Sequence, residues 1–452
     1  MNLFPQDDEV ILYQTGFSDD LLGRKKISSQ LSELVEKISD PLVLALDDTW
    51  GSGKTYFLKR WVHDHGAVNG GKAIAVYYDA FESDYLSDPL SSLMLAIRAR
   101  IPDDSQEALQ KWMAIGARLA KPAFGVALSM ATFGAKQHLE DIGDALVDAV
   151  STEAKDSSEG LWQRERQKLE ALDAFKKLLI DLTVKELRPI VIVVDELDRC
   201  RPDYALSVLE VIKHLFSVPR VHFILGVNGK ALENSVRARY GAEVDAHNYL
   251  KKFINLSFSL PRFVGERGAD NVVAVYAAKK GAEMQLPAQV LNRSLELLRL
   301  VARSNQVSLR DVGKILSKMA LLPSELFENE YHIGYIDTLC ILLVSSIVDP
   351  IFHSKYANEN AKMEDIETFI GAAKIKTTEK IGQNSNEHFD RQMTTWLITM
   401  MYCSIPDEID GAEHLPSWRK SIGTRFDSFG GLREPEKIPA KLQSEWLDIF
   451  RL

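Results

Sequence analysis

The sequence predicts an α/β protein, in which a parallel sheet carries helices on both faces, followed by an all-α C-terminal region. Two observations lead to this prediction. Short runs that are apolar throughout alternate with segments of helical periodicity, and such strands are typical of a parallel sheet buried on both faces. After Pro261 no further convincing strand follows, and the remainder shows amphipathic helix patterns and loops.

The expected strands are short and apolar. They are 41–46 (PLVLAL), 73–81 (AIAVYYDAF), 189–194 (PIVIVV) and 221–227 (VHFILGV). Prolines mark the approach to the last two, because Pro189 ends the preceding helical pattern and Pro219 interrupts the chain before the fourth strand.

Helices are expected between these strands, at 19–38, 55–65, 161–187 and 203–217. In the first of them Leu31, Val35 and Ile38 lie at helical spacing, and Asp19 and Asp20 are candidates for its start. Each helix follows or precedes a strand, which is the order that parallel neighbours require.

The composition is that of a soluble globular protein. The 452 residues are 46% hydrophobic and 26% charged, and this length suggests two or three domains. The net charge of −10 argues against a protein whose main task is coating nucleic acid. Three widely spaced cysteines define no disulfide framework or zinc site, and the acidic start MNLFPQDDEV resembles no secretory signal, so we expect a cytoplasmic protein.

Two apolar stretches are compared with a membrane span. The segment 122–135 (PAFGVALSMATFGA) is uncharged, but it is shorter than the roughly 17–25 apolar residues that a spanning helix needs. The run 338–348 (TLCILLVSSIV) is shorter still. We therefore expect no transmembrane helix, and membrane contact is considered only near 112–135.

The segment 48–55 (DTWGSGKT) carries the strongest chemical signal. It lies between an expected strand and an expected helix, as the phosphate-binding pattern G-x-x-x-x-G-K-[ST] requires. Gly51 and Gly53 would let backbone N–H groups turn toward phosphate oxygens, where a Cβ would crowd them. Lys54 would place its ammonium on the β- and γ-phosphates, and the Thr55 hydroxyl would ligate Mg²⁺ beside the helix N-terminus.

One position departs from this pattern. Asp48 stands where the first glycine is expected, and a carboxylate there would weaken a phosphate site electrostatically. The alternative interpretation is a chance Gly-rich turn before a helix. The strand–loop–helix context and the acidic partner described next make that alternative less favourable.

The partner is an apolar strand that ends in acidic residues, 195–199 (DELDR). Asp195 would lie near Mg²⁺, directly or through water. Glu196 is the candidate to orient or deprotonate the attacking water. For Asp198 and Arg199, a role in the site and a solvated position at the strand end are both open.

The strand at 221–227 is followed by Asn228, which is a further candidate. A polar residue at this point of a nucleotide-hydrolysing sheet can sense the γ-phosphate. An asparagine that caps the turn before Gly229 is an equally good interpretation.

In combination, these segments resemble the KAP family of P-loop NTPases, which is related to the signalling ATPases with numerous domains (STAND). TWGSGKT is similar to the family's W-G-x-G-K-[ST] loop, and 195–216 (DELDRCRPDYALSVLEVIKHLF) to its acidic box running into a helix. Further similar stretches, in the family's order, are DLLGR (20–24), YDAFESDYLSDPLSSL (78–93, with Phe81 where tryptophan is usual), NYLKKFINLSFSLP (248–261, as a helix ending in Leu-Pro) and SLRDVGKIL (308–316). The likeness covers roughly residues 18–320.

The resemblance implies a P-loop NTPase that binds ATP with Mg²⁺ and hydrolyses it slowly, driving a conformational switch. Arg310 would correspond to a lid arginine that reaches the nucleotide, and Arg199 would act within the site or on a neighbouring subunit. A surface ion pair is the alternative for both arginines. The expected catalytic set is Lys54, Glu196, Arg199, Asn228 and Arg310. The expected nucleotide-binding set is Trp50, Gly51, Ser52, Gly53, Lys54, Thr55 and Tyr56, with Thr55 and Asp195 on the metal.

The expected organisation is a 1–18 N-terminal segment, a 19–262 P-loop NTPase core with an insertion at about 105–160, a 263–330 helical lid, and a 331–452 C-terminal helical domain. Relatives often carry membrane helices in the insertion position, and here we expect a soluble insertion or a degenerate form of that element. The expected partner is another protein, bound through the C-terminal helices or the insertion, and an ATP-dependent homo-oligomer is considered. No strong nucleic-acid signal is present.

Three hypotheses on function stay open. The first is the ATPase switch. The second is a nucleotide-binding scaffold with little or no hydrolysis, and the reason to consider it is Asp48 in the phosphate loop. The third is a membrane-associated regulator held through 112–135. These residues do not identify the biological process, but the resemblance implies prokaryotic signalling or defence against phages and plasmids.

Overall fold

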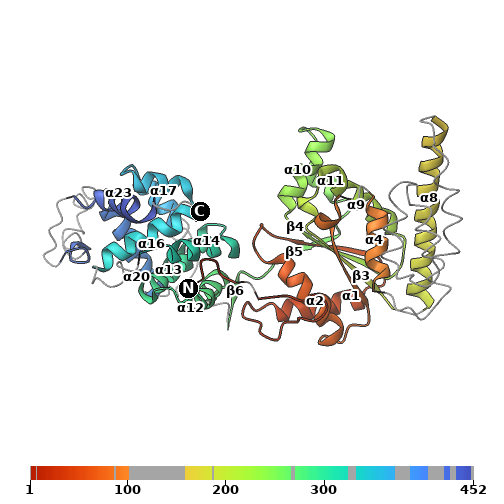
Figure 1. Cartoon of the computed structure of the whole chain (residues 1–452), viewed down its shortest axis with the longest axis horizontal. Coiled ribbons are helices and arrows are strands. Elements are labelled where there is room, and N and C mark those ends of the chain that lie inside the picture. Colours follow the sequence, from red (N-terminus) through yellow and green to blue (C-terminus); the bar gives the residue numbers. More distant parts are fainter. Residues whose placement is uncertain are drawn as a thin grey trace.

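A parallel sheet flanked by helices forms one lobe of the molecule, and a group of packed helices forms the other (Figure 1). The computed structural model describes residues 2–6, 8–85, 88–100, 158–185, 188–265, 270–323, 332–371, 387–405, 422–427 and 434–448. The expected insertion at 105–160 lies outside the described residues apart from 158–160, and the segment 112–135 lies outside them entirely.

The strands of the α/β lobe are β1 (Leu42–Asp47), β2 (Ile74–Asp79), β3 (Ile190–Asp195), β4 (Val221–Val227) and β5 (Leu256–Phe258). Their spatial order is β2-β3-β4-β1-β5, and every neighbouring pair is parallel. The expected strands match β1 to β4 to within one or two residues at each end. This agreement has a simple cause, since β3 and β4 are buried along their whole length and are therefore apolar throughout.

The fifth strand corrects an expectation. The resemblance implies a helix through 248–261, but α11 (Ala246–Leu250) is short and β5 then pairs with β1. The backbone N–H of Asn255 donates to the Val43 carbonyl at 2.9 Å, and the Asn255 side-chain oxygen accepts the Val43 N–H at 2.7 Å. These bonds hold the chain on the sheet edge, so the expected helix is wrong. Beyond Pro261, β6 (Phe263–Val264) and β7 (Asp270–Asn271) form a small antiparallel pair that the sequence does not predict.

Two layers of helices cover the sheet, as predicted. One hydrophobic cluster joins α1 and α2 to Leu44 and Leu46 of β1, and another joins the opposite helices to Val43 and Ala45 of the same strand. This alternation follows from the two-residue period of a strand. The helices of this lobe are α1 (Lys25–Lys37), α2 (Lys54–Ala67), α3 (Ala80–Ser83), α4 (Pro89–Arg98), α8 (Ser158–Ile180), α9 (Pro202–Leu215) and α10 (Gly229–Tyr240), with short turns η1 (Asp181–Lys185) and η2 (Leu197–Arg199).

Two expected helices change their bounds. The helix expected at 19–38 begins only at Lys25, because the Asp20 carboxylate accepts the backbone N–H groups of Arg24 and Lys25, each at 2.7 Å. The helix expected at 161–187 leaves α-helical geometry after Ile180 and continues as the π-helical turn η1.

The helical lobe has one hydrophobic core. Buried residues from Val273 to Leu442 belong to a single cluster, so helices on both sides of the expected boundary at 330 pack together. The helices are α12 (Val272–Glu283), α13 (Ala288–Ser304), α14 (Leu309–Ala320), α16 (Ile333–Val348), α17 (Pro350–Ala357), α18 (Met363–Ile370), α20 (Glu387–Tyr402) and α23 (Lys437–Leu442), followed by η5 (Gln443–Leu447). The apolar run 338–348 lies in α16 within this core. Among the helices in the described ranges, none combines the length and apolar character needed to cross a bilayer.

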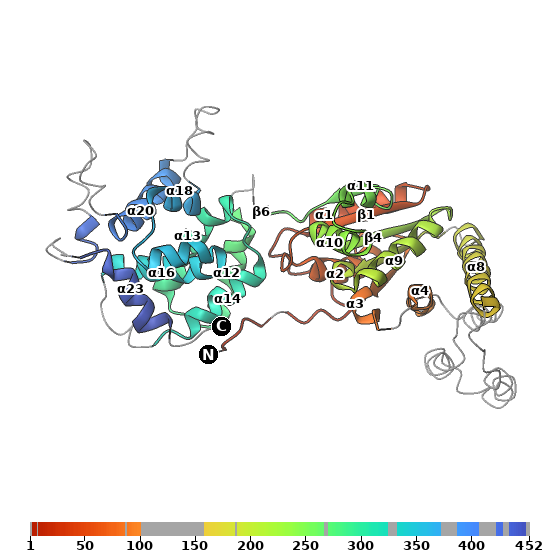
Figure 2. The ribbon, with the colours of Figure 1, turned by 90° about the horizontal axis from the view of Figure 1, so that it is seen from above.

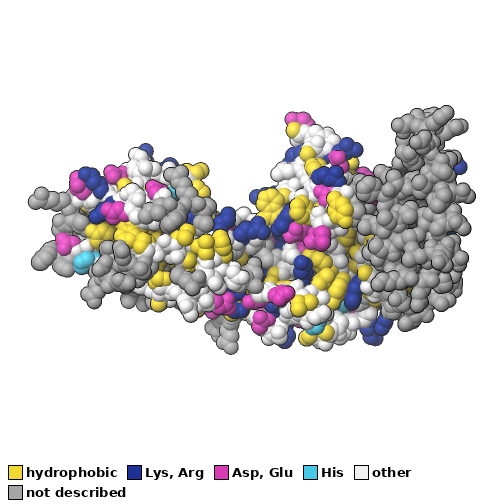
Figure 3. Space-filling model, in the orientation of Figure 1, with side chains coloured by type: hydrophobic (Ala, Val, Ile, Leu, Met, Phe, Trp, Pro, Cys, Tyr) yellow, Lys and Arg dark blue, Asp and Glu magenta, His cyan; other side chains and the backbone are white. Residues whose placement is uncertain are grey.

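The N-terminal segment connects the two lobes (Figure 2). Lys280 of α12 donates to the Gln6 carbonyl at 2.7 Å and pairs with Asp8 at 3.1 Å. Farther along, Phe17 is buried in the α/β lobe and its N–H donates to Asp64 of α2 at 3.1 Å. The segment therefore spans from the helical lobe to the sheet, beside the hollow between the lobes that Figure 3 shows.

Candidate nucleotide-binding site

The site lies where the strands end. β4 is placed between β1 and β3, and its register sets Val227 beside Asp47 and Gly226 beside Asp195. The carboxyl ends of these parallel strands therefore share one edge, which is where open α/β sheets bind ligands. A cavity of about 900 Å³ opens at this edge, walled by the phosphate loop, the acidic end of β3, the N-terminal segment and helices α12 and α14.

The phosphate loop depends on its two glycines. Gly51 and Gly53 have φ of 81° and 89°, a left-handed conformation that disfavours residues with a Cβ. A Cβ on Gly51 would lie 2.6 Å from the Arg310 Cβ, and one on Gly53 would lie 2.7 Å from the Arg24 Nη1. The loop thus needs glycine for its own turn and for the close approach of two arginines from other elements.

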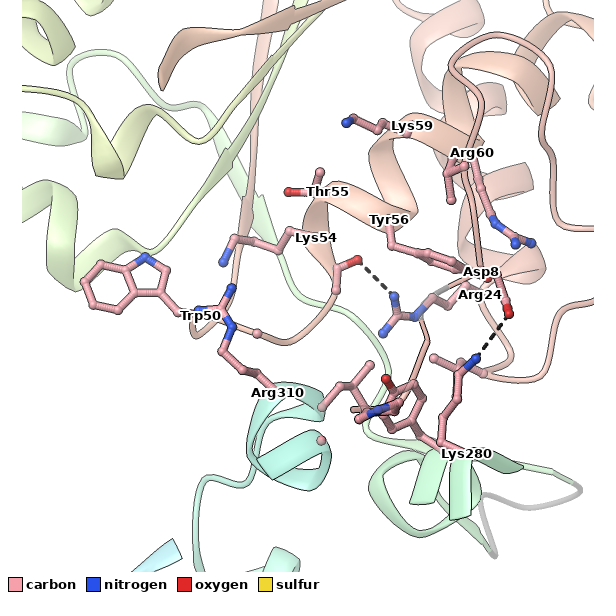
Figure 4. Close-up of a pocket in the computed structure, with 18 of the residues that line it drawn as sticks. Asp8, Arg24, Trp50, Lys54, Thr55, Tyr56, Lys59, Arg60, Lys280 and Arg310 are labelled. Carbon is pink, nitrogen blue, oxygen red and sulfur yellow. Dashed lines mark hydrogen bonds and ion pairs between the residues drawn. The ribbon is translucent and has the colours of Figure 1, made fainter. Parts of the chain in front are cut away.

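Lys54 begins α2 and turns back into the loop. Figure 4 shows its side chain at the loop. Its ammonium donates to the carbonyls of Asp48 at 2.7 Å and Thr49 at 3.1 Å. Burial lowers the pKa of Lys54, and the nearby carboxylates of Asp198, Asp48 and Asp195 oppose that shift. The side chain stands inside the loop, where the sequence predicts that it meets the phosphates.

Asp48 is not among the residues that line the main cavity. The Oδ1 atom accepts the Thr49 backbone N–H at 2.8 Å, and the residue lines a separate small cavity of about 50 Å³ on the other side of the loop. Ser52 lines the same small cavity. The Asp48 carboxylate is therefore bonded to the next backbone N–H, and it is close enough to Lys54 to oppose the lowering of that lysine's pKa.

Asp195 is buried at the end of β3, with 1% of its surface exposed. Its Oδ2 accepts the Tyr77 hydroxyl at 2.8 Å, and its Oδ1 accepts the Glu196 N–H at 2.9 Å. Burial raises the pKa of Asp195 to about 6, although hydrogen bonds from Tyr77, Thr55 and the Glu196 backbone favour the charged form. Gly226 leaves room for this carboxylate, since a Cβ there would lie 2.4 Å from the Asp195 Oδ1.

Glu196 has an unusual backbone. Its φ of 58° and ψ of 24° are left-handed, which costs a residue with a side chain about 1–2 kcal/mol. Its Oε1 accepts the Thr55 hydroxyl at 3.4 Å and pairs with Arg199 Nη1 at 2.9 Å. Strained residues of this kind concentrate at functional sites. The strain places the second carboxylate beside the phosphate-loop threonine.

Several expected site residues meet in the main cavity. Residues of the expected site that line it are Trp50, Gly51, Gly53, Lys54, Thr55, Tyr56, Asp195, Glu196, Arg199 and Arg310. The Trp50 indole donates to the Asp198 carboxylate at 2.5 Å, which ties the phosphate loop to the acidic box. The Tyr56 ring lies under the Arg60 guanidinium, 4.3 Å from its centroid, and burial raises the pKa of Tyr56 to about 12.

Asn228 takes the capping position that the sequence left open. Its side-chain oxygen accepts the Ala231 N–H at 3.4 Å and so caps α10. Gly226, two residues earlier, lines the main cavity. The role of γ-phosphate sensor stays a prediction for Asn228.

Helix α14 brings Arg310 to the phosphate loop. The Leu309 N–H donates to the Gly51 carbonyl at 3.0 Å, and Figure 4 shows the Arg310 side chain rising from the helix toward the loop. Ser308 and Asp311 form a reciprocal capping box that starts α14 at this point. The sequence pattern therefore fixes where the helix begins, and the helix start fixes where the arginine stands.

Two parts of the site escape sequence reasoning. Arg24 binds the back of the phosphate loop, and Lys280 holds the N-terminal segment at the cavity wall through Asp8 (Figure 4). The signal for Arg24 was present in the DLLGR segment, but its contact lies 29 positions away. Nothing in the sequence pairs Asp8 with Lys280, which is 272 positions away.

The donors present fit a nucleotide with Mg²⁺. Gly51 and Gly53 leave a backbone cradle that a Cβ would fill, and Thr55 and Asp195 offer hard oxygen donors beside it. No group of three metal-binding side chains occurs in the described part of the chain. Magnesium bound with phosphates needs no such group, because it shares its ligands with the phosphates and keeps several waters.

The phosphate loop, the acidic strand end and the parallel sheet define the class of protein: this is a nucleotide-binding P-loop NTPase. Comparison with protein families gives the particular family. Residues 24–325 match the model of the KAP family P-loop domain, which is more than half of the chain, and the chain therefore belongs to that family.

The chain also has distant structural neighbours. The ORC2 protein of Aeropyrum pernix in its ADPNP–ADP complexes is 12% identical, with a TM-score of 0.37 over 86% of this chain and 87% of that one. The ADP form of the same protein is 12% identical, with a TM-score of 0.29 over 89% of this chain and 100% of that one. No curated protein matches the sequence.

Proposed function

We propose that the protein binds ATP with Mg²⁺, hydrolyses it slowly, and uses the nucleotide state to change how its two lobes are joined. The observation that carries this proposal is the contact between α14 and the phosphate loop. The Leu309 N–H is bonded to the Gly51 carbonyl, and Arg310 lines the same cavity as Lys54 and Glu196. A change at the phosphates therefore acts directly on a helix of the other lobe.

The residues divide the chemistry among them. Lys54 and the loop N–H groups bind the phosphates, and Arg310 adds positive charge from the helical lobe. When Mg²⁺ is bound, it neutralises phosphate charge, and Thr55 and Asp195 are the residues that would hold it. Thr55 and Arg199 both contact the Oε1 of Glu196. We propose that the other carboxylate oxygen, Oε2, accepts the proton of the attacking water.

The test is ATP turnover of the wild type, Lys54→Ala and Glu196→Gln, together with ATP binding by each. We expect Lys54→Ala to lose binding, because the phosphates lose their main side-chain cation. Glu196→Gln should still bind ATP but turn it over at least ~100-fold more slowly, since general base catalysis is worth about 10²–10⁴-fold. Wild-type turnover no faster than that of Glu196→Gln would overturn the enzyme proposal.

A nucleotide-binding scaffold with little hydrolysis is the second candidate. One observation favours it: the ion pair with Arg199 occupies Glu196 Oε1 at 2.9 Å and restrains the carboxylate. In that case ATP would bind tightly to the wild type, and Arg199→Ala would raise turnover by freeing Glu196. Under the ATPase proposal the same substitution leaves turnover equal or lowers it.

A further inference from the structure

Arg24 is a buried cation at the back of the phosphate loop. It stands just before α1, and 1% of its surface is exposed. Its Nη1 donates to the Gly53 carbonyl at 3.0 Å and its Nη2 to the Ser52 carbonyl at 2.7 Å. Figure 4 shows the guanidinium directed at the loop backbone. The side chain thus spans two successive peptide groups with its planar fork.

The guanidinium has no full countercharge. Its Nε has no hydrogen-bond partner among the described residues, and none of their carboxylates forms an ion pair with it. Burial lowers the pKa of Arg24 to about 10, only partly opposed by Tyr56, Asp20 and Asp48. At neutral pH the residue is therefore charged, desolvated and bound only to carbonyl oxygens.

Two other arginines of the described chain, the buried Arg60 and the mostly buried Arg293, are compensated. Arg60, which lines the same cavity, is paired with Asp19 and also donates to the Gly16 carbonyl. Arg293 in the helical lobe is paired with Asp337 at 2.6 Å. A buried charge is costly unless it is paired, so an unpaired one beneath an anion-binding loop indicates that the missing countercharge belongs to the ligand.

The contact also orients the loop. The carbonyl of Ser52 belongs to the same planar peptide as the Gly53 N–H, and the carbonyl of Gly53 to the same peptide as the Lys54 N–H. In a trans peptide these groups point in opposite directions, and the described chain has no cis peptide. Holding both carbonyls toward Arg24 therefore turns both N–H groups away from it, toward the concave side of the loop.

We propose that Arg24 is a positioning residue of the nucleotide site, which fixes two loop peptides and supplies an unneutralised positive charge that selects polyphosphate over monophosphate nucleotides. This inference rests on the proposed function, because it assumes that ATP is bound at this loop. The selection arises because a tri- or diphosphate brings more negative charge to the buried guanidinium than a monophosphate does.

The experiment measures the affinities of the full chain for ATP, ADP and AMP, with Mg²⁺, by calorimetric titration. We expect Arg24→Met to weaken ATP and ADP binding about tenfold or more, because two charge-assisted hydrogen bonds to the loop are lost. AMP binding should weaken less than threefold. Equal losses for ATP and AMP, or none, would overturn the inference. Wild-type protein that binds no nucleotide would overturn the proposed function as well.

Two further variants separate positioning from folding. Arg24→Lys keeps the charge but cannot span both carbonyls, so it should retain the preference for ATP over AMP while binding ATP about threefold to tenfold more weakly. Wild-type ATP affinity in this variant would contradict the positioning role. Arg293→Met is the control, because it removes a mostly buried, paired arginine of the helical lobe that does not line the cavity. It should lower the melting temperature and leave the ATP-to-AMP ratio unchanged.

Discussion

The two lobes treat buried charge in opposite ways. In the helical lobe, the fully buried Asp337 is bonded to two arginines, Arg293 and Arg425, which join α13, α16 and the segment 422–427. At the sheet edge of the α/β lobe, Asp195 and Arg24 are equally buried but have no ion pair among the described residues. The difference indicates that the first cluster is complete in the protein alone, while the second is completed by a ligand.

Replacing Asp337 provides the strongest test of this comparison. Asp337→Asn removes the buried charge that two partly buried arginines share, and breaking such a cluster is expected to cost about 3–5 kcal/mol. Urea unfolding of the variant and the wild type measures this cost. Nucleotide binding by the protein that remains folded should be unchanged. A loss below about 1 kcal/mol would show that the cluster is not what stabilises the helical lobe.

The matching substitution in the α/β lobe should have the opposite sign. Burial raises the folded-state pKa of Asp195 to about 6 from its ordinary value of 3.8, so the folded protein binds more protons than the unfolded chain between about pH 4 and 6. Without Mg²⁺, the stability of the wild type should therefore fall as pH rises through this window, by about 3 kcal/mol in total.

Asp195→Asn should remove the fall in stability between about pH 4 and 6, so that at pH 7 without Mg²⁺ the variant is at least as stable as the wild type. The same substitution should weaken Mg²⁺-dependent ATP binding. Thermal melting from pH 4 to 7, with and without Mg²⁺ and ATP, checks both parts. The comparison between lobes would break if Asp195→Asn destabilised the protein at pH 7 as Asp337→Asn does.

The smallest effect is expected where the lobes meet. Asp8 is partly exposed, and its ion pairs with Lys279 and Lys280 outweigh burial and lower its pKa. The stabilisation is present above the unfolded-state pKa and is lost as pH falls through the folded-state pKa, in the acid range below about 4. Asp8→Asn should therefore cost only about 0.5–1 kcal/mol at pH 7, since solvent screens such pairs. Salt titration of the melting temperature provides the check, because the difference from the wild type should shrink at high ionic strength.

The sequence predicts the sheet and the phosphate loop because in both the local structure restricts which residue types can stand there. Strands such as β3 are apolar because both faces are buried, and Gly51 and Gly53 are glycine because the loop turns there. β5 escapes prediction because it is short, exposed on part of its surface and held by the Asn255 contact to Val43. Tertiary packing alone decides other features, such as the position of Asp48 beside a separate small cavity, and no local sequence pattern predicts them.

The bond between the N-terminal segment and α12 has a consequence for the order in which the molecule is assembled. Gln6 and Asp8 leave the ribosome long before Lys280, the residue that holds them against the cavity wall. Domains generally fold as they emerge, so the sheet and its loop are free to form while this wall is still absent. Ribosome-bound chains that end before α12 should expose an incomplete nucleotide site, which the last part of synthesis closes.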